Sequence, residues 1–209
     1  MKNYIVTIAR GFGSGGRTIG AMLANDLGIG YYDKDISRMA SDKSGISEGL
    51  FNLSDERVSE SIFSRPKQYK GGLITPDKAD FTSADNLFNY QASVINSLAD
   101  SGESCVIVGR CADYVLRGRK NVFRLFIHAD METCIRNTMN VMGITSRSEA
   151  EKLIKKTDKE RAAYYKAKTG SNWDYVGNYD LILDTSDMDF ESCVKIIKGY
   201  IEIAGEVKL

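Results

Sequence analysis

The sequence has one histidine, His128, and four cysteines scattered between residues 105 and 193. The cysteines form no CxxC pair and are too few for a disulfide scaffold. A single histidine leaves little from which to build a zinc site. Disulfide-stapled and zinc-dependent classes of protein are therefore not expected.

The chain also lacks a long apolar run and a net charge. No apolar run approaches the ~20 residues that span a bilayer, and residues 1–4 lead into a short strand rather than a signal peptide. Lysine plus arginine (28) balance aspartate plus glutamate (28). No overall field therefore draws the chain to a nucleic acid polymer or an anionic membrane. We expect a cytoplasmic protein with small-molecule partners, in which a local charge cluster holds any anionic ligand.

The composition is otherwise that of a folded α/β domain: of the 209 residues, 43% are hydrophobic and 27% are charged. Short apolar, β-branched runs alternate with segments of helical periodicity. The runs are residues 4–9, 105–108, 122–127 and 181–183, and the helical segments include 18–27, 35–40, 86–99 and 190–203. This alternation predicts a doubly wound parallel sheet with helices on both faces.

Residues 11–18 read GFGSGGRT and match the phosphate-loop pattern GxxxxGK[ST] except at the lysine, which is Arg17. Glycines let backbone N–H groups surround a polyphosphate, and the following helix adds its N-terminal partial charge. The predicted nucleotide-binding residues are Gly11, Gly13, Ser14, Gly15, Gly16, Arg17 and Thr18, with the Thr18 hydroxyl also a magnesium ligand. The alternative is a plain glycine-rich turn with Arg17 in solvent. The position between a buried strand and an amphipathic helix favours phosphate binding.

Four segments carry a family resemblance: residues 8–17 (IARGFGSGGR), 31–33 (YYD), 106–110 (VIVGR) and 179–185 (YDLILDT). With them the sequence resembles the P-loop nucleoside monophosphate kinases, in particular the cytidylate kinase-like branch. The resemblance implies a P-loop NTPase-type three-layer αβα fold with a helical acceptor-binding insert and a helical lid. It also implies magnesium-dependent transfer of the γ-phosphoryl group of ATP to a nucleoside monophosphate, most naturally a pyrimidine nucleotide.

On this pattern the chain is one domain. The core is expected at about 1–41, 86–142 and 179–209, the insert at about 42–85 and the lid at about 143–178. The insert holds both prolines and a basic run, Arg65, Lys67 and Lys70, with weak periodicity. A long segment of that composition inside a compact chain is typical of a binding flap.

The sequence departs from cytidylate kinase proper at three places. Arg17 replaces the lysine of the phosphate loop, and Cys111 stands where an acid follows Gly-Arg, with Asp113 two positions later. The predicted lid is also less rich in alternating arginine and aspartate. Two other functions therefore stay open: a kinase for another small acceptor, and a nucleotide-binding module without turnover.

The acceptor side is predicted from polar residues at the carboxyl ends of strands, where doubly wound sheets bind ligands. Asp33 would meet the acceptor or hold magnesium through water, the alternative being an N-cap for the next helix. Arg38 resembles the family's arginine for the acceptor phosphate, although a solvated helix arginine is the alternative. Arg110 would also reach an acceptor phosphate, and Asp113 would substitute for the missing acid.

The charge on the migrating phosphoryl group requires cations that close over it. Arg161 is the predicted lid cation, and Arg136 is a further candidate for adenine stacking or γ-phosphate contact. The alternative for this mixed-charge helix is a solvated face of i,i+4 pairs. The predicted catalytic residues are Arg17, Arg110 and Arg161.

Overall fold

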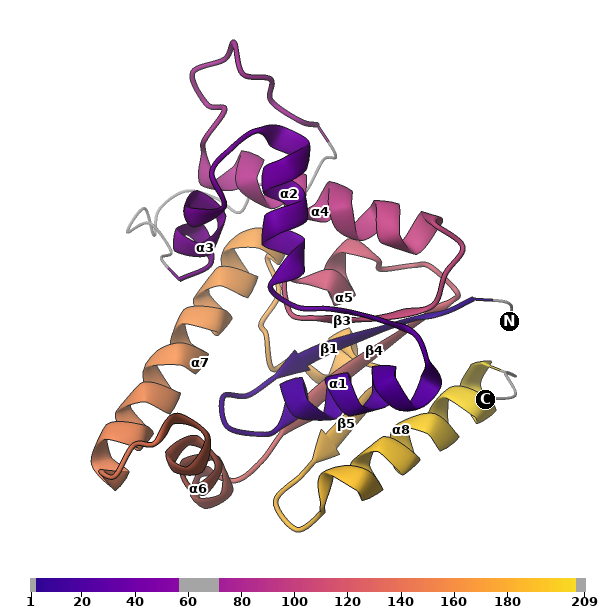
Figure 1. Ribbon diagram of the computed structural model, residues 1–209, viewed down its shortest axis with the longest axis vertical. Helices are drawn as coiled ribbons and strands as arrows, with labels where there is room; N and C mark the ends of the chain where they lie inside the picture. Colours follow the sequence, from indigo (N-terminus) through magenta and orange to yellow (C-terminus); the bar gives the residue numbers. More distant parts are fainter. Residues whose placement is uncertain (1–2, 57–71, 206–209) are drawn as a thin grey trace.

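A computed structural model of the chain describes residues 3–56 and 72–205 (Figure 1). Its centre is a five-stranded, all-parallel sheet with the order β2-β3-β1-β4-β5. The strands are β1 Ile5–Arg10, β2 Gly30–Tyr32, β3 Cys105–Val108, β4 Val122–His128 and β5 Leu181–Asp184. The central strand β1 is an almost continuous apolar run because helices cover both faces of the sheet.

Two helical layers enclose the sheet (Figure 1). Helices α1 (Gly16–Leu27) and α8 (Phe190–Gly205) pack on one face, where Ile19 and Ile197 are fully buried against the strands. Helices α2 (Asp35–Ser44), α4 (Ala84–Asp100) and α5 (Ala112–Val115) belong to the apolar cluster of the other face. The predicted three-layer αβα fold with a doubly wound sheet is confirmed.

Helices α6 (Met131–Met142) and α7 (Arg147–Thr169) pack together beside the loop that follows β1. Side chains cap both helices: Asp130 accepts a hydrogen bond from the Thr133 N–H, and Ser146 accepts one from the Glu149 N–H. Ile135 and Ile154 form a shared apolar cluster against which Phe12 packs. Helix α7 therefore lies directly against the predicted phosphate loop.

The structure describes residues 42–56 and 72–85 of the predicted insert. They include α3 (Glu48–Glu56), which contacts α2, α4 and α7 and buries Phe51 completely. The basic run Arg65, Lys67 and Lys70 lies outside the described residues. None of the helices within the described ranges is long and apolar enough to cross a membrane.

Candidate active site

The loop between β1 and α1 has the conformation that its glycines make possible. Gly13 and Gly15 have φ angles of 80° and 82°, in the left-handed region that favours glycine. Ser14 is fully buried, and its Oγ donates to the Gly11 carbonyl at 2.9 Å. Gly15, the N-cap of α1, has no side chain to cap the helix, and the Gly16 N–H donates to Oγ of Ser14 at 3.4 Å. The N-terminal end of α1 therefore faces the loop with its positive partial charge, as phosphate binding requires.

Four arginines from separate parts of the chain line one pocket of about 400 Å³ beside this loop. Arg10 ends β1, Arg17 is in the first turn of α1, Arg110 follows β3 and Arg161 is on α7. With Lys34, basic residues outnumber acidic ones in the pocket lining by five to three. The molecule has no net charge, so this local surplus of positive charge favours anions at the pocket over the rest of the surface.

Asp33 connects two of these arginines across the pocket. Its Oδ2 lies 2.6 Å from Nε of Arg17, and its Oδ1 lies 3.8 Å from Nη2 of Arg10. The residue that precedes α2 as its N-cap is Lys34, so the alternative prediction of Asp33 as a helix cap does not describe the structure. Asp33 is buried, and its carboxylate binds Arg17 closely with one oxygen while the other oxygen faces Arg10.

The turn after β3 has an unusual backbone. Gly109, Arg110 and Cys111 follow one another with φ angles of 77°, 57° and 52°. Left-handed conformations at non-glycine residues cost of order 1–3 kcal/mol each and cluster at functional sites. Here the turn places Arg110 in the pocket and buries Cys111 against Tyr164 and Tyr165. Burial raises the pKa of the Cys111 thiol, which is therefore a small packed side chain rather than a reactive group.

Helix α7 is joined to the phosphate loop through two side chains one turn apart. Nη1 of Arg161 donates to the carbonyl of Arg10 at 3.0 Å and to Oδ1 of Asp158 at 3.1 Å, and its guanidinium lies over the Phe12 ring. The same Oδ1 of Asp158 accepts from the Phe12 N–H at 2.9 Å. Burial lowers the pKa of Arg161 and raises that of Asp158. Arg161, the predicted lid cation, therefore lies at the loop and in the pocket.

Asp113 is a buried carboxyl group in the pocket lining. The Tyr165 hydroxyl donates to its Oδ2 at 2.6 Å. Burial raises the pKa of Asp113 from 3.8 to about 6, and hydrogen bonds to the carboxylate oppose the shift only in part. At neutral pH the Asp113 carboxyl group is therefore ionised, and the burial of its charge lowers the free energy of unfolding.

This loss of stability predicts a pH-dependent effect of Asp113→Asn. Between the ordinary pKa and the raised one, a rising pH ionises the residue first in the unfolded chain, so stability falls through this window and stays low above pH 6. Because asparagine carries no charge, the variant should gain about 1–3 kcal/mol in free energy of unfolding at pH 7.5. Urea denaturation should show this gain at pH 7.5 and little of it at pH 4.

A matched control for Asp113→Asn is Asp26→Asn, which neutralises an exposed carboxylate paired with Lys198. The control should not gain stability between pH 4 and 7.5. An Asp113→Asn variant with the same stability difference at both pH values would contradict burial as the cause of the raised pKa.

Eight predicted site residues lie apart from the pocket lining in the described part of the chain: Arg38, Arg136, Thr18 and the loop residues Gly11, Gly13, Ser14, Gly15 and Gly16. Arg38 is mainly exposed and pairs with Asp35 on its own helix at 2.9 Å. Arg136 is exposed on α6 and donates to Oγ1 of Thr133. Thr18 is exposed in the first turn of α1, directly after Arg17. The structure therefore brings together Arg17, Asp33, Arg110, Asp113 and Arg161, and leaves Arg38 and Arg136 outside this group.

The residues present fit magnesium at one of the two predicted positions. Mg²⁺ is usually held by one or two protein oxygens together with phosphates and waters, and the exposed Thr18 hydroxyl suits that arrangement. Both oxygens of Asp33 face arginines, which disfavours direct metal ligation, and the predicted contact to magnesium through water stays a prediction. In the described ranges, no group of three or more histidine, cysteine or acidic residues could hold a metal ion.

Two residues of the site, Arg10 and Asp158, had no role predicted from the sequence. Arg10 stands immediately before the glycine loop, and its position at the carboxyl end of β1 was the signal that could have identified it. Asp158 lies one helical turn before Arg161, but only the packing of α7 on the loop shows that its carboxylate binds the Phe12 N–H.

A comparison with protein-family models matches residues 5–187 to the cytidylate kinase-like family. The chain belongs to this family. The predicted resemblance is thereby confirmed, and membership supports the predicted phosphotransferase activity of a P-loop kinase. A comparison with curated proteins found no match.

Solved structures agree with this assignment at the level of the fold. An uncharacterized protein from Eubacterium ventriosum ATCC 27560 is 25% identical with a TM-score of 0.70, and the match covers 96% of this chain and 99% of that one. Shikimate kinase from Bacteroides thetaiotaomicron is 12% identical with a TM-score of 0.55, over 95% and 98% of the two chains. A gluconokinase from Sinorhizobium meliloti 1021 is 13% identical with a TM-score of 0.52, over 98% and 95%.

Proposed function

We propose that this cytidylate kinase-like protein transfers the γ-phosphoryl group of ATP to a nucleoside monophosphate, with a pyrimidine nucleotide as the favoured acceptor. The observation that carries the proposal is the pocket beside the glycine loop, where arginines from four separate elements converge. Phosphoryl transfer depends mainly on positioning and on stabilising negative charge, and such a cluster supplies both. The family supports the kinase activity, and the choice of acceptor is our proposal.

On the donor side, the loop of residues 11–18 would bind the phosphates of ATP. The N–H groups of α1 point toward the loop, and Arg17 would replace the usual lysine as the cation for the outer phosphates. Thr18 would hold Mg²⁺, which neutralises phosphate charge when it is bound. Arg161 would then act on the transferred group from α7.

On the acceptor side, Arg110 is the proposed ligand of the monophosphate. The strained turn that carries it projects from the carboxyl end of β3, next to β1 and its glycine loop. Asp113, Tyr165 and Trp173 line the same pocket and offer polar and aromatic contacts to the body of the acceptor. Arg38 is not included, because it pairs with Asp35 on the exposed side of its helix.

A second acceptor class has one specific observation in its favour. Arginine binds carboxylates as well as phosphates through two parallel hydrogen bonds, so the same cluster would also hold a carboxylate-bearing acceptor. The structural neighbours named shikimate kinase and gluconokinase share the fold. A small hydroxy acid is therefore the alternative to a nucleotide.

The proposed function is tested with ATP, Mg²⁺ and a panel of acceptors, with ADP and the phosphorylated product measured separately. The panel contains CMP, dCMP, UMP, AMP and GMP, the corresponding nucleosides, shikimate and gluconate. At least one monophosphate, a pyrimidine first, should yield a diphosphate, and nucleosides should fail because the acceptor arginines would be left unpaired. Product from a hydroxy acid alone would replace the proposal with the second class. ATP binding without turnover on any acceptor would indicate a non-catalytic module.

A further inference from the structure

Arg10 occupies the space between the two halves of the proposed site. A Cβ on Gly16, in the donor loop, would lie 2.6 Å from Cβ of Arg10. A Cβ on Gly109, in the acceptor turn, would overlap Nη1 of the same arginine. The stem of Arg10 therefore passes against the donor loop and its guanidinium reaches the acceptor turn, in a space that exists because both neighbours are glycines.

The charge around Arg10 is mainly positive. Its side chain is 15% exposed, and Oδ1 of Asp33 is 3.8 Å from Nη2, while the other oxygen of Asp33 is bound by Arg17. Burial, together with the positive charges of Arg161, Arg17 and Arg110, lowers the pKa of Arg10 to about 9, and Asp33 opposes this shift. A buried cation that a shared carboxylate neutralises only in part is stabilised when an anion binds beside it.

We propose that Arg10 binds the transferred phosphoryl group directly, midway between donor and acceptor, and that Asp33 acts as its positioning residue. This inference rests on the proposed function for the identity of the two ligands. It assigns Arg10 a catalytic contact, and it assigns Asp33 to holding arginines rather than a metal. Arg161 approaches the same group from α7, so cations from the sheet and from the helix meet at one place.

The chemical step explains why a cation is needed at that place. An oxygen of the acceptor phosphate attacks the γ-phosphorus of ATP with one of its electron pairs, and the bond from that phosphorus to the β–γ bridging oxygen breaks. ADP leaves with the electrons of the broken bond. The charge on the migrating group is spread over its equatorial oxygens, where the guanidinium of Arg10 can donate two hydrogen bonds.

The decisive experiment compares the affinities of the full-length protein for ATP and for ADP by calorimetry. Only ATP carries the γ-phosphate that Arg10 would bind, and the measurement needs no acceptor and no turnover. Arg10→Gln should weaken ATP binding about tenfold or more and change ADP binding less than about threefold, the loss corresponding to a hydrogen bond to a charged group. Arg10→Lys, which keeps a cation, should recover part of the difference.

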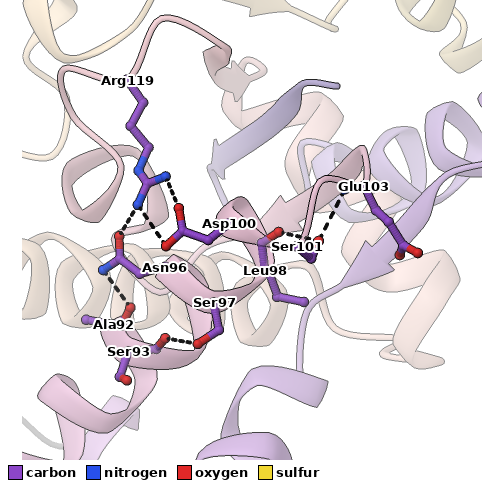
Figure 2. Close-up of polar contacts among 9 residues, drawn as sticks. All are labelled: Ala92, Ser93, Asn96, Ser97, Leu98, Asp100, Ser101, Glu103 and Arg119. Atoms are coloured by element: carbon purple, nitrogen blue, oxygen red, sulfur yellow. Dashed lines mark hydrogen bonds and ion pairs between the residues drawn. The ribbon is translucent and has the colours of Figure 1, made fainter. Parts of the chain in front are cut away.

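Arg119→Gln is the matched control. Arg119 also forms an ion pair, 2.6 Å from Asp100, and donates to Asn96, as Figure 2 shows. It follows α5 and precedes β4, at the amino edge of the sheet, opposite the edge that carries the pocket. This variant should bind both nucleotides as the wild type does. Melting temperatures show whether each variant folds. If Arg10→Gln does not fold, the affinities for ATP and ADP are compared in Arg10→Lys instead.

The outcomes separate this inference from the proposed function. Equal losses of ATP and ADP affinity in Arg10→Gln, or no loss of either, would overturn the role of Arg10. A selective loss of ATP affinity supports it, even if the acceptor panel yields no diphosphate, in which case only the proposed acceptor is wrong. Asp33→Asn should produce the same selective loss in weaker form, and an unchanged ATP affinity in that variant would remove Asp33 as the positioning residue.

Discussion

Replacing Arg161 with alanine should lower kcat by about 10² or more, with the KM of the acceptor changing little. Arg161 lies in the pocket and touches the phosphate loop through the Arg10 carbonyl. A cation at this place acts on charge that is stronger in the transition state than in the ground state, so its loss appears in kcat. We expect a smaller decrease in kcat than the upper range of 10³–10⁵ known for arginine fingers, because three other arginines remain in the same pocket.

The control for this prediction is Arg147→Ala, an identical substitution on the same helix. Arg147 is exposed and pairs with Glu132, and in the described structure it does not line the pocket. Its loss should leave kcat within about twofold, since surface ion pairs contribute little. Steady-state kinetics and melting temperatures should be measured on both variants. An unchanged kcat in a folded Arg161→Ala variant would transfer the lid role to another basic residue such as Arg136.

Gly16→Val should reduce ATP affinity by about a thousandfold, since several hydrogen bonds from N–H groups to a charged phosphate would be lost together. Any side chain on Gly16 meets Arg10, because a Cβ there would lie 2.6 Å from Cβ of Arg10 and 3.3 Å from that of Ile127. The branched valine must therefore displace the loop or Arg10. Either movement disrupts the place where backbone meets phosphate.

Gly199→Val is the control for Gly16→Val. Gly199 is also in a helix, α8, and a Cβ added there would meet nothing within 4 Å. This variant should bind ATP as the wild type does, with stability unchanged or slightly raised, because valine has a higher helix propensity than glycine. For both variants, calorimetry measures the affinity for ATP, and a thermal melt shows whether the protein is folded. Full ATP affinity in a folded Gly16→Val variant would show that the glycine loop is not a phosphate loop.

The secondary structure follows closely from local pattern where burial is complete. Strand β3 occupies the predicted residues, Cys105–Val108, because a parallel strand covered on both faces reads as an unbroken apolar run. Helix α7 begins at Arg147, directly after Ser146, a residue type that favours helix N-caps. Helix α5 was not predicted, and α3 was expected only in so far as the resemblance implied a helical insert, without bounds. The four residues of α5 are too few to show periodicity, and α3 depends on contacts with α2, α4 and α7.

The site was predicted in part. The glycine loop is a local feature, and the carboxyl ends of neighbouring strands indicated where Asp33 and Arg110 would meet it. Arg38 resembled an acceptor ligand by its position in sequence, whereas its rotation about α2 directs it to Asp35. The functional roles of these residues, and the boundaries of the proposed insert and lid, stay predictions for the experiments above to test.

By itself, the sequence determined the order of strands and helices, the glycine loop and the need for a local cluster of positive charge in a chain without net charge. The elements and the glycine loop depend on residues close together in the chain, and the net charge depends on composition alone. Tertiary structure alone decided which charges share the pocket, because Arg10 meets Gly109 and Arg161 only when β1, β3 and α7 have packed together. It also decided that Asp33 faces arginines, since the orientation of a side chain across a crevice depends on neighbours that are distant in sequence.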